Sequence, residues 1–529
     1  MNFFRIRTRG DGALLAAAAL VAMTGVALQP ARAAAAPFAA SSSTLTKAAV
    51  YNMPNGNFAE PETIRGNPIE IPLRIPPDYA AAGESASATA LASTAVNQAA
   101  APEGITKECS TNVATGFAPS DIHGAAAPAN LVVVTNVDIG VYRKSDCGVV
   151  SRVPLKTFFG AFAIPATTTL FDPRVLYDRP GQRCIALAES RDSGNTDQFL
   201  FVAVSTTNAC TSWRLYRLTL SSGTSFFCKN AVTDFYDYPN AGYNRDALVV
   251  TANNFGASVV GSILKFDKPA LYSGAGGTVY CFNNQTTNIT PAVVSGTTSS
   301  IMYILSPKTT GSITRLKLNT GSTPPTLSAT ASISIPAWAV PPKAVQPNGK
   351  IIDTIDGRFQ SATKQIGTSL WNVHTIGSGT FAKWRLYKLS TTGTSPLFTF
   401  GPVTTNQTGC TNGDDLFNPS LDTNSAAAGS GLYVTASRTC RSGGTAGFPA
   451  LLVFRGSNSS TAGWVFNLVE TSPVQFASCP TPRGCRWGDY SSTQIDPSNG
   501  ANAWGFNQLV ASPGTDQFNW ITRAGRITP

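Results

Sequence analysis

Titratable side chains are scarce in this chain of 529 residues, and their scarcity narrows the chemistry open to it. Only 13% of the residues are charged, and only two are histidines, His123 and His374. Two histidines are too few for a His-rich metal site, and a Ser-His-Asp triad would depend on one of them. After Ser120 the only glutamates are Glu189 and Glu470. A carboxylate-based catalyst in that region would therefore draw mainly on aspartates.

Several signatures of enzymes and of nucleic-acid-binding proteins are missing. The chain has no Gly-x-Ser-x-Gly elbow between a strand and a helix, the hallmark of α/β-hydrolases. It has no CxxC pair, so a zinc site is not expected, and no cofactor is predicted. It has no cluster of basic residues, so we expect no nucleic-acid binding. The formal net charge of +10 instead suits contact with anionic polymers or cell surfaces.

The N-terminal residues predict export. Three arginines precede an apolar segment at residues 13–27, and the small residues Ala31 and Ala33 occupy positions −3 and −1 of a cleavage site. The apolar segment is shorter than the roughly 20 residues that a membrane-spanning helix needs. We therefore predict a signal peptide at residues 1–33, cleaved near Ala33. The mature chain is expected to be secreted or periplasmic, without a transmembrane segment.

The ten cysteines all follow the predicted signal peptide. An even number of cysteines in an exported chain favours disulfide bonds, although spacing alone leaves the full connectivity open. We expect four or five bridges. The short separations favour Cys479–Cys485, Cys410–Cys440 and Cys184–Cys210.

Residues 34–118 differ in composition from the rest of the chain. The segment 80–101 is nearly all Ala, Ser, Thr and Gly, with little that could form a core. One strand is expected near Ile69-Glu70-Ile71. We predict an irregular, low-complexity leader or linker at 34–118 and one β domain at 119–529.

The β domain consists of short apolar runs rich in branched and aromatic residues, without an amphipathic helix of three turns. Ser212–Leu218 reads SWRLYRL and returns as KWRLYKL at Lys383–Leu389, which indicates an internal repeat. Polar turns open successive units at a mean spacing of about 61 residues. These opening turns are Ser120-Asp121, Phe171-Asp172-Pro173, Tyr236-Asp237-Tyr238-Pro239, Ser295-Gly296, Asp356-Gly357-Arg358, Phe417-Asn418-Pro419 and Trp487-Gly488-Asp489.

The repeat predicts an all-β fold, a β-propeller of seven blades. A single unit could not bury both of its faces, and closing the units into a ring removes exposed sheet edges. The alternative is two β-sandwiches in tandem. In the ring, Trp213 and Trp384 would occupy equivalent, buried places in two blades three units apart.

Several opening turns carry motifs that are similar to those of a known family. The motifs are Asp121-Ile122-His123-Gly124 followed by Val134-Thr135-Asn136, Asp172 to Asp178, Val204 to Thr207 leading to Trp213, Asp237-Tyr238-Pro239, Arg486 to Tyr490, and Asp496-Pro497. Together they resemble a bacterial family of secreted β-propeller proteins over residues 119–529. The resemblance implies the fold and brings no agreed activity with it. His123 departs from the family, which usually has Asn or a similar residue there.

The candidate catalytic residues are carboxylates near the opening turns and one histidine. A glycosidase needs two carboxylates facing one cleft, and an opening turn of a propeller leads into an innermost strand. The alternative is that each aspartate bonds the backbone of its own turn, which the recurrence of Asp favours. His374 lies in a strand pattern, and a structural or channel-lining role is favoured for it. The catalytic candidates are Asp172, Asp237, Asp489, Glu189 and His374.

Arginines and aromatic side chains are the candidates for ligand binding. Aromatic rings can stack on sugar rings, although such rings more often pack between blades. The predicted set is Arg174, Arg358, Trp371, Trp487 and Tyr490. Calcium is a further candidate, because the loops at residues 191–197 and 412–415 carry several oxygen donors. Neither loop has EF-hand spacing, and a plain polar turn is the favoured interpretation of each.

The absence of a catalytic set favours a secreted binding or surface-interaction protein over an enzyme. Its expected partners are extracellular or cell-envelope polymers such as polysaccharide, and it is expected to be a monomer. The alternative is a polysaccharide hydrolase or lyase whose site lies at the channel mouth and uses the aspartates of the opening turns with Arg174 and Arg358.

Overall fold

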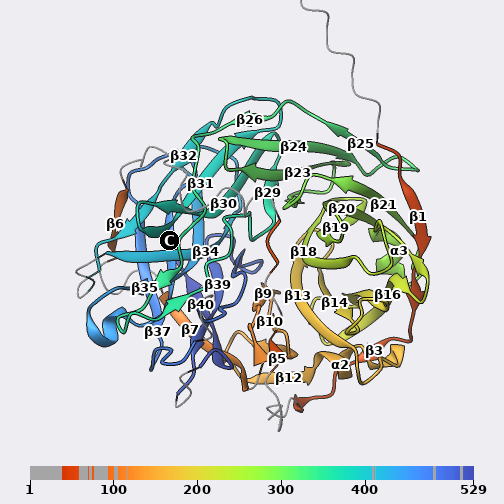
Figure 1. Ribbon diagram of the computed structural model, residues 1–529, viewed down its shortest axis with the longest axis horizontal. Coiled ribbons are helices and arrows are strands. Elements are labelled where there is room, and N and C mark those ends of the chain that lie inside the picture. The colour runs from red at the N-terminus through yellow and green to blue at the C-terminus, as the bar shows by residue number, and fades with distance from the viewer. Residues whose placement is uncertain are drawn as a thin grey trace, which may run out of the picture. The chain divides into compact units, whose positions relative to one another are not determined.

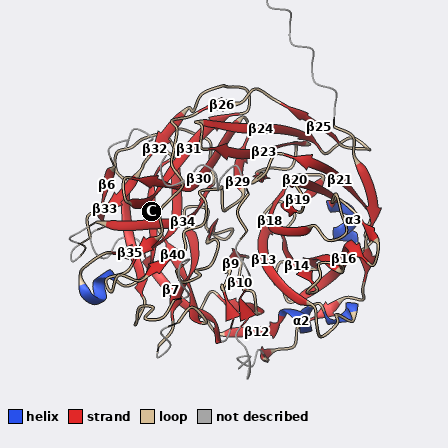
Figure 2. Ribbon diagram, in the orientation of Figure 1, coloured by secondary structure: helices blue, strands red, loops and turns tan. Residues whose placement is uncertain are grey.

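The computed structural model describes residues 38–58, 69–70, 74–76, 93–99, 105–115, 117–407, 410, 413–479, 484–512 and 516–529. The predicted signal peptide lies outside these residues. The described chain is built almost entirely of strands (Figure 2), which confirms the all-β prediction. None of its helices has both the length and the apolar character needed to cross a bilayer.

Seven strands of the described chain each begin an antiparallel meander (Figure 1). These first strands are β9 (His123–Ala126), β13 (Thr169–Asp178), β18 (Phe235–Tyr243), β22 (Thr290–Val294), β29 (Thr363–Ile366), β34 (Asp414–Thr423) and β38 (Ser492–Ile495). Each first strand contacts the next along the chain, and β38 contacts β9. This closed succession defines a β-propeller, as predicted, and excludes two sandwiches in tandem. We call the space that the first strands enclose the channel.

The remaining strands follow each first strand outward. After β9 come β10 (Asn130–Val134), β11 (Asp138–Arg143) and β12 (Val149–Pro154); after β13 come β14 (Arg183–Arg191), β15 (Gln198–Ser205), β16 (Ser212–Ser222) and β17 (Ser225–Phe226); after β18 come β19 (Ala247–Phe255), β20 (Val259–Asp267) and β21 (Thr278–Gln285). After β22 come β23 (Ile301–Lys308), β24 (Ser312–Asn319), β25 (Thr326–Ala329) and β26 (Ile333–Ser334); after β29 come β30 (Ser369–Ser378), β31 (Phe381–Ser390) and β32 (Phe398–Phe400). After β34 come β35 (Gly431–Cys440), β36 (Ala450–Ser457) and β37 (Val465–Thr471), and after β38 come β39 (Ala503–Val510) and β40 (Asn519–Ile527).

The smaller elements connect or flank these sheets. They are the helices α2 (Leu155–Phe158) and α3 (Lys268–Ser273), the 3₁₀ turns Gly160–Phe162 and Gly444–Gly447, the strand pair β27 (Ala344–Val345) and β28 (Ile351–Ile352), and β33 (Val403–Thr405). Because β22 also pairs in parallel with β29, the strands β22–β26 and β29–β32 form one hydrogen-bonded sheet, while β27 and β28 stay outside it. The number of blades, seven, therefore stays a prediction.

The segment predicted as a leader supplies strands to several sheets. β1 (Ser41–Thr44) pairs with β21, β2 (Thr46–Lys47) and β3 (Tyr51–Asn52) pair with β16, and β4 (Gly56–Asn57) pairs with β12. β5 (Ile69–Glu70), the strand expected there, pairs with β8 (Phe117–Ala118), and β6 (Thr94–Gln98) lies between β33 and β37. β7 (Ile105–Thr115) is the outer strand of the β38–β40 sheet. Strands in the described parts of residues 34–118 thus pair with strands of the β domain predicted at 119–529.

The opening turns are found where the spacing places them, with one exception. Six of them lie just before a first strand or within its opening residues, whereas Ser295-Gly296 follows β22. Polar turn residues mark both ends of a strand, so composition alone does not tell the two ends apart.

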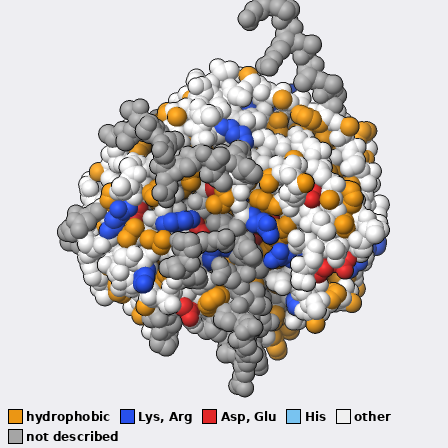
Figure 3. All heavy atoms as spheres, in the orientation of Figure 1, with side chains coloured by type: hydrophobic (Ala, Val, Ile, Leu, Met, Phe, Trp, Pro, Cys, Tyr) orange, Lys and Arg blue, Asp and Glu red, His pale blue; other side chains and the backbone are white. Residues whose placement is uncertain are grey.

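The core lies between neighbouring sheets. Val132 and Val141 of the first sheet pack in one apolar cluster with Phe201 and Trp213 of the second. Each such side chain contributes about 1.5–3 kcal/mol of burial free energy. Exposed large apolar side chains are few in the described chain, and on the face in Figure 3 hydrophobic atoms lie in small groups.

The two repeat tryptophans are both fully buried, as predicted, but they lie on strands that occupy different positions in the order of their sheets. Trp213 lies on β16, the fourth strand of its sheet, whereas Trp384 lies on β31, the third. The expectation of equivalent places is therefore wrong. The alternation of apolar and basic residues suits any strand packed between two sheets, so it does not specify which strand carries it.

Candidate functional site

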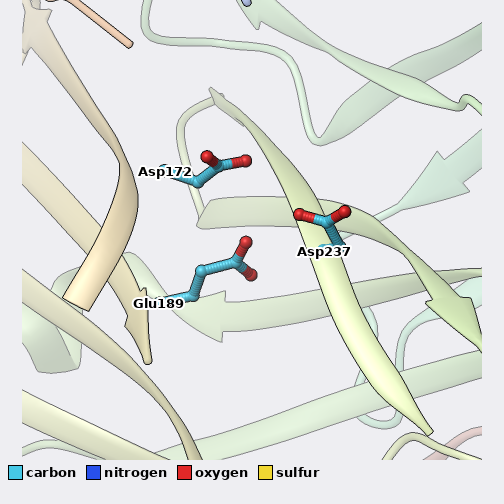
Figure 4. A group of neighbouring side chains, drawn as sticks. All are labelled: Asp172, Glu189 and Asp237. Carbon is cyan, nitrogen blue, oxygen red and sulfur yellow. The ribbon is translucent and has the colours of Figure 1, made fainter. Parts of the chain in front are cut away.

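Three carboxylates from three strands meet beside the opening turns, and we call them the acidic cluster. Asp172 comes from β13, Glu189 from β14 and Asp237 from β18. One carboxylate oxygen from each lies within 4.8 Å of the other two. The carboxylates point toward one another (Figure 4). All three residues are at most 6% exposed.

A β-bulge lies at each of the two aspartates of the cluster, Asp172 and Asp237. The pairing of β13 with β14 shifts between Phe171 and Arg174, and Asp172 has a positive φ of 48°. The pairing of β18 with β19 shifts between Asp237 and Asn240. Each bulge contains a proline, which cannot donate to the ladder. A bulge changes the direction of a side chain locally, and next to these bulges the carboxylates of Asp172 and Asp237 point toward each other and toward Glu189.

Burial and like charges disfavour ionisation of the acidic cluster. Burial raises the pKa of Asp172 to about 8, and the nearby charges of Asp237 and Asp489 act in the same direction. Burial also raises the pKa of Asp237 to about 7, although Arg358 opposes the shift. The pKa of Glu189 lies well above its ordinary value because Glu189 is buried and lies beside Asp172 and Asp237.

Asp489 and Asp121 link the last opening turn to the first. The backbone amide of Asp489 donates to Oδ1 of Asp121 at 2.7 Å, and Asn136 Nδ2 donates to Oδ2 of Asp121 at 2.7 Å. Arg486 forms an ion pair with Asp489 at 2.8 Å. Asp237, in contrast, accepts from the amide of the next residue, Tyr238, at 2.9 Å. Backbone bonding within the same turn thus holds for Asp237, while Asp121 bonds a neighbouring unit.

Arg174, Arg358 and Tyr490 gather around the acidic cluster but are engaged within the protein. The Arg174 guanidinium lies 3.3 Å from the centre of the Tyr490 ring and donates to the carbonyls of Pro239 and Gln360. The Arg358 guanidinium forms an ion pair with Asp356 at 2.7 Å. These contacts leave few free donors for a ligand.

The remaining predicted site residues lie in the packed interior. Trp371 belongs to an apolar cluster between sheets, and Trp487 donates through Nε1 to Ser437 at 2.9 Å. His374 Nδ1 lies 2.7 Å from the Gly357 carbonyl, and burial lowers the pKa of His374 to about 3. All three are at most 1% exposed.

The calcium candidates already have protein partners in their described parts. Both oxygens of Asp192 accept hydrogen bonds, from the Thr196 hydroxyl and the Asp197 amide. Asp414 forms an ion pair with Lys383 at 2.5 Å, and Asp415 accepts from two backbone amides. The contacts of Asp192 fit a polar turn, whereas Asp414 and Asp415 begin the strand β34.

A second feature lies at the other end of the first strands, and we call it the strand-end cavity. Its volume is about 460 Å³. The lining comes from residues that end or follow the first strands and from neighbouring turns: Pro128, Tyr177, Arg179, Pro180, Gln182, Asn208, Tyr243, Ser295, Gly296, Lys364, Asn424 and Pro497. No carboxylate is among them. A smaller cavity of about 50 Å³, lined in part by His123 and Asp422, shares Tyr243 and Lys364 with it.

The sequence analysis did not predict the strand-end cavity, nor some of the charged residues near the acidic cluster. Asp121 and Asp356 belong to opening turns, and Arg486 directly precedes one. The positions of these residues in the repeat could therefore have marked them as candidates. Arg179 and Lys364 lie in turns and strand ends that no motif marks. Only the convergence of the first strands brings them together.

Comparisons with solved structures return proteins of several kinds. The chain is similar to the α-L-arabinofuranosidase of Fusarium graminearum in complex with arabinobiose, with 9% identity over 77% of this chain and 92% of that chain and a TM-score of 0.36. It is also similar to the BP39L lectin from Burkholderia pseudomallei, with 11% identity over 78% of this chain and 98% of that chain and a TM-score of 0.39. A third similar structure is the WD40 domain of SCAP from fission yeast, with 8% identity over 80% of this chain and 96% of that chain and a TM-score of 0.34. No protein-family model and no curated protein matches the sequence. Since all three TM-scores are below 0.5, the β-propeller class rests on the closed succession of first strands.

Proposed function

We propose that this protein is a secreted, non-catalytic binding protein whose ligand is an extracellular or cell-envelope polysaccharide. The observation that carries the proposal is the strand-end cavity. Its volume of about 460 Å³ lies within the range of small-ligand sites, and its lining combines amides, tyrosines, the cation Arg179 and Lys364, which forms an ion pair with Asp422 at 2.8 Å. Amide and guanidinium groups suit the hydroxyl and carboxylate groups of acidic sugars.

The distribution of carboxylates supports binding rather than hydrolysis. Glycoside hydrolysis needs two carboxyl groups that flank the scissile bond. The strand-end cavity has none in its lining. The acidic cluster has three, yet Asp172, Glu189 and Asp237 are only 1–6% exposed. Burial of this degree weighs against the alternative of a hydrolase or lyase acting at the opening turns.

Export belongs to the proposal. The ten cysteines form five disulfides: Cys109–Cys147, Cys184–Cys210, Cys228–Cys281, Cys410–Cys440 and Cys479–Cys485. Disulfides form and persist in oxidising compartments, which supports a periplasmic or extracellular location. A monomer fits the small number of exposed large apolar side chains among the described residues.

Binding of the mature protein to purified envelope polysaccharides and to a glycan array tests the proposal. Retention on at least one acidic polysaccharide is expected. Arg179→Ala should weaken that binding about tenfold, the size of one charge-assisted hydrogen bond. The control is Arg143→Ala, which removes an exposed arginine paired with Asp146 and not part of the cavity lining.

Two results would count against the proposal. The first is that no polysaccharide or surface fraction retains the wild-type protein. The second is that Arg179→Ala and Arg143→Ala bind as tightly as the wild type, which would locate the ligand elsewhere. Release of reducing sugar ends from a bound polysaccharide would favour the enzyme alternative instead.

A further inference from the structure

The acidic cluster has the ligand chemistry of a hard divalent cation. Asp172, Glu189 and Asp237 each offer one oxygen, and the three oxygens lie within 4.8 Å of one another. Calcium binds carboxylate oxygens at roughly 2.3–2.6 Å, so two oxygens on one ion can be up to about 5 Å apart. An ion between the three carboxylates therefore needs shifts of at most a few tenths of an ångström to bind all of them. The three side chains already point to a common centre (Figure 4).

The guanidinium groups of Arg174, Arg191 and Arg358 interact electrostatically with this cluster, but none of them forms an ion pair with it. Among the described residues, no Lys or Arg forms an ion pair with Asp172, Glu189 or Asp237. The nearby Arg358 and Arg486 form ion pairs with Asp356 and Asp489 instead. Three carboxylates at this distance and burial repel one another strongly unless a counter-charge or protons intervene.

Glu189 provides an independent indication of a ligand. It is 1% exposed, and both of its carboxylate oxygens lack a hydrogen-bond partner. The Tyr238 amide lies close enough to Glu189 to lower its pKa, but it donates to Asp237 Oδ1 at 2.9 Å. A buried polar group without a partner costs about 1–3 kcal/mol, and more if it is charged, so natural proteins rarely leave one unsatisfied.

A cation between the carboxylates would give the oxygens of Glu189 a partner and would bind both aspartates at the same time.

We propose that Asp172, Glu189 and Asp237 form a buried Ca²⁺ site at the opening-turn end of the channel. The ion joins β13, β14 and β18, which belong to two neighbouring sheets. Its role is structural: it holds the bulged opening turns of these sheets at fixed positions. This inference is independent of the proposed polysaccharide site, whose lining shares no residue with the cluster.

Calcium content of the purified mature protein tests this site. After equilibration with calcium chloride and removal of free ion, elemental analysis should find about one calcium per chain in the wild type. Glu189→Gln keeps the side-chain shape but removes a charged ligand, so retained calcium should fall at least tenfold. The matched control is Glu470→Gln, a glutamate on β37 paired with Arg523, which should retain calcium like the wild type.

Circular dichroism and thermal unfolding must show that each variant is folded. If Glu189→Gln does not fold, Asp237→Asn takes its place with the same expected loss. A crystal of the calcium-equilibrated protein should show a density peak bonded to all three carboxylates. The proposal is overturned if the wild type retains no calcium, if the folded variant retains as much as the wild type, or if the ion lies elsewhere.

Discussion

Cys109 of β7 forms a disulfide with Cys147, which lies between β11 and β12 of the first sheet. The strand β7 is also the outer strand of the β38–β40 sheet, where it pairs along β40. One N-terminal strand thus completes the last sheet and is covalently tied to the first. This arrangement joins the beginning and the end of the ring, which is the point where a closed propeller can open most easily.

Removing this bridge should destabilise the ring. For the double variant Cys109→Ala with Cys147→Ala, we expect a loss of about 2–4 kcal/mol in the free energy of unfolding, the usual contribution of a native disulfide. Denaturant unfolding would measure it. Removal of Cys479–Cys485 should cost less, since it closes a loop of only six residues. Equal losses in both double variants would contradict a special role of the ring closure.

The strands before residue 119 should be required for folding. A chain that begins at Ser120 lacks β7, so the β38–β40 sheet exposes an unpaired edge and Cys147 has no partner. An unpaired edge strand favours aggregation. We expect this chain to be insoluble or to unfold without cooperativity, whereas a chain beginning at Pro37 should unfold in one sharp transition. A cooperative transition for the shorter chain would show that residues 34–118 are dispensable.

Truncating either repeat tryptophan should cost much of the stability of the domain. Trp213→Ala and Trp384→Ala each empty a fully buried aromatic site, and we expect losses of about 3–5 kcal/mol. Trp384 contacts the rings of Phe400, Phe454 and Trp464, and Trp213 contacts Phe158. The loss should therefore be larger for Trp384.

The matched control for the tryptophans is Leu397→Ala, at a side chain that is 60% exposed. Its effect should stay within about 0.5 kcal/mol. Denaturant unfolding of the three variants would measure these losses in the free energy of unfolding. Small losses for both tryptophans would contradict the packing of these rings between sheets.

A carboxylate pair beside β7 should make stability depend on pH. Partial burial raises the pKa of Glu108 to about 7, helped by a hydrogen bond with Glu470 and opposed by Arg523, which forms an ion pair with Glu108 at 3.3 Å. The folded protein thus holds a proton that the unfolded chain releases above about pH 4.5. The contribution of Glu108 is fully present below pH 4.5 and is lost as the pH rises to about 7.

Thermal unfolding of the wild type and Glu108→Gln between pH 4 and pH 8 would measure this contribution. The glutamine keeps a donor toward Glu470 at every pH. The difference in melting temperature between the two proteins should therefore shift in favour of the variant as the pH rises from about 4.5 to about 7. A difference that does not change with pH would contradict the shared proton.

The sequence predicted the class of fold because each blade repeats the same local chemistry. Asp-Pro and Asn-Pro pairs mark the bulges of β13 and β34, and apolar runs mark the strands after them. These signals are local, so they can be read along the chain. Three short-range disulfides could be predicted for the same reason, since Cys184–Cys210, Cys410–Cys440 and Cys479–Cys485 link residues at most 30 positions apart.

Pairings over long distances could not be predicted in this way. β7 reads as part of a polar leader, yet it completes a sheet formed by strands about 400 residues later. Its partner edge exists only after the ring has formed. The rank of a strand within its sheet, which separates Trp213 from Trp384, likewise depends on its neighbours and not on its own residues.

By itself, the sequence determined the all-β class, the propeller repeat and the positions of the opening turns, because these follow from local backbone preferences and from the period of apolar residues. Only the tertiary structure decided which side chains meet. Closure of the ring brings Asp172, Glu189 and Asp237 to one end of the channel and Arg179 and Lys364 to the other. Burial then sets their chemistry, because the cost of an unpaired charge depends on the surrounding protein and not on the sequence position.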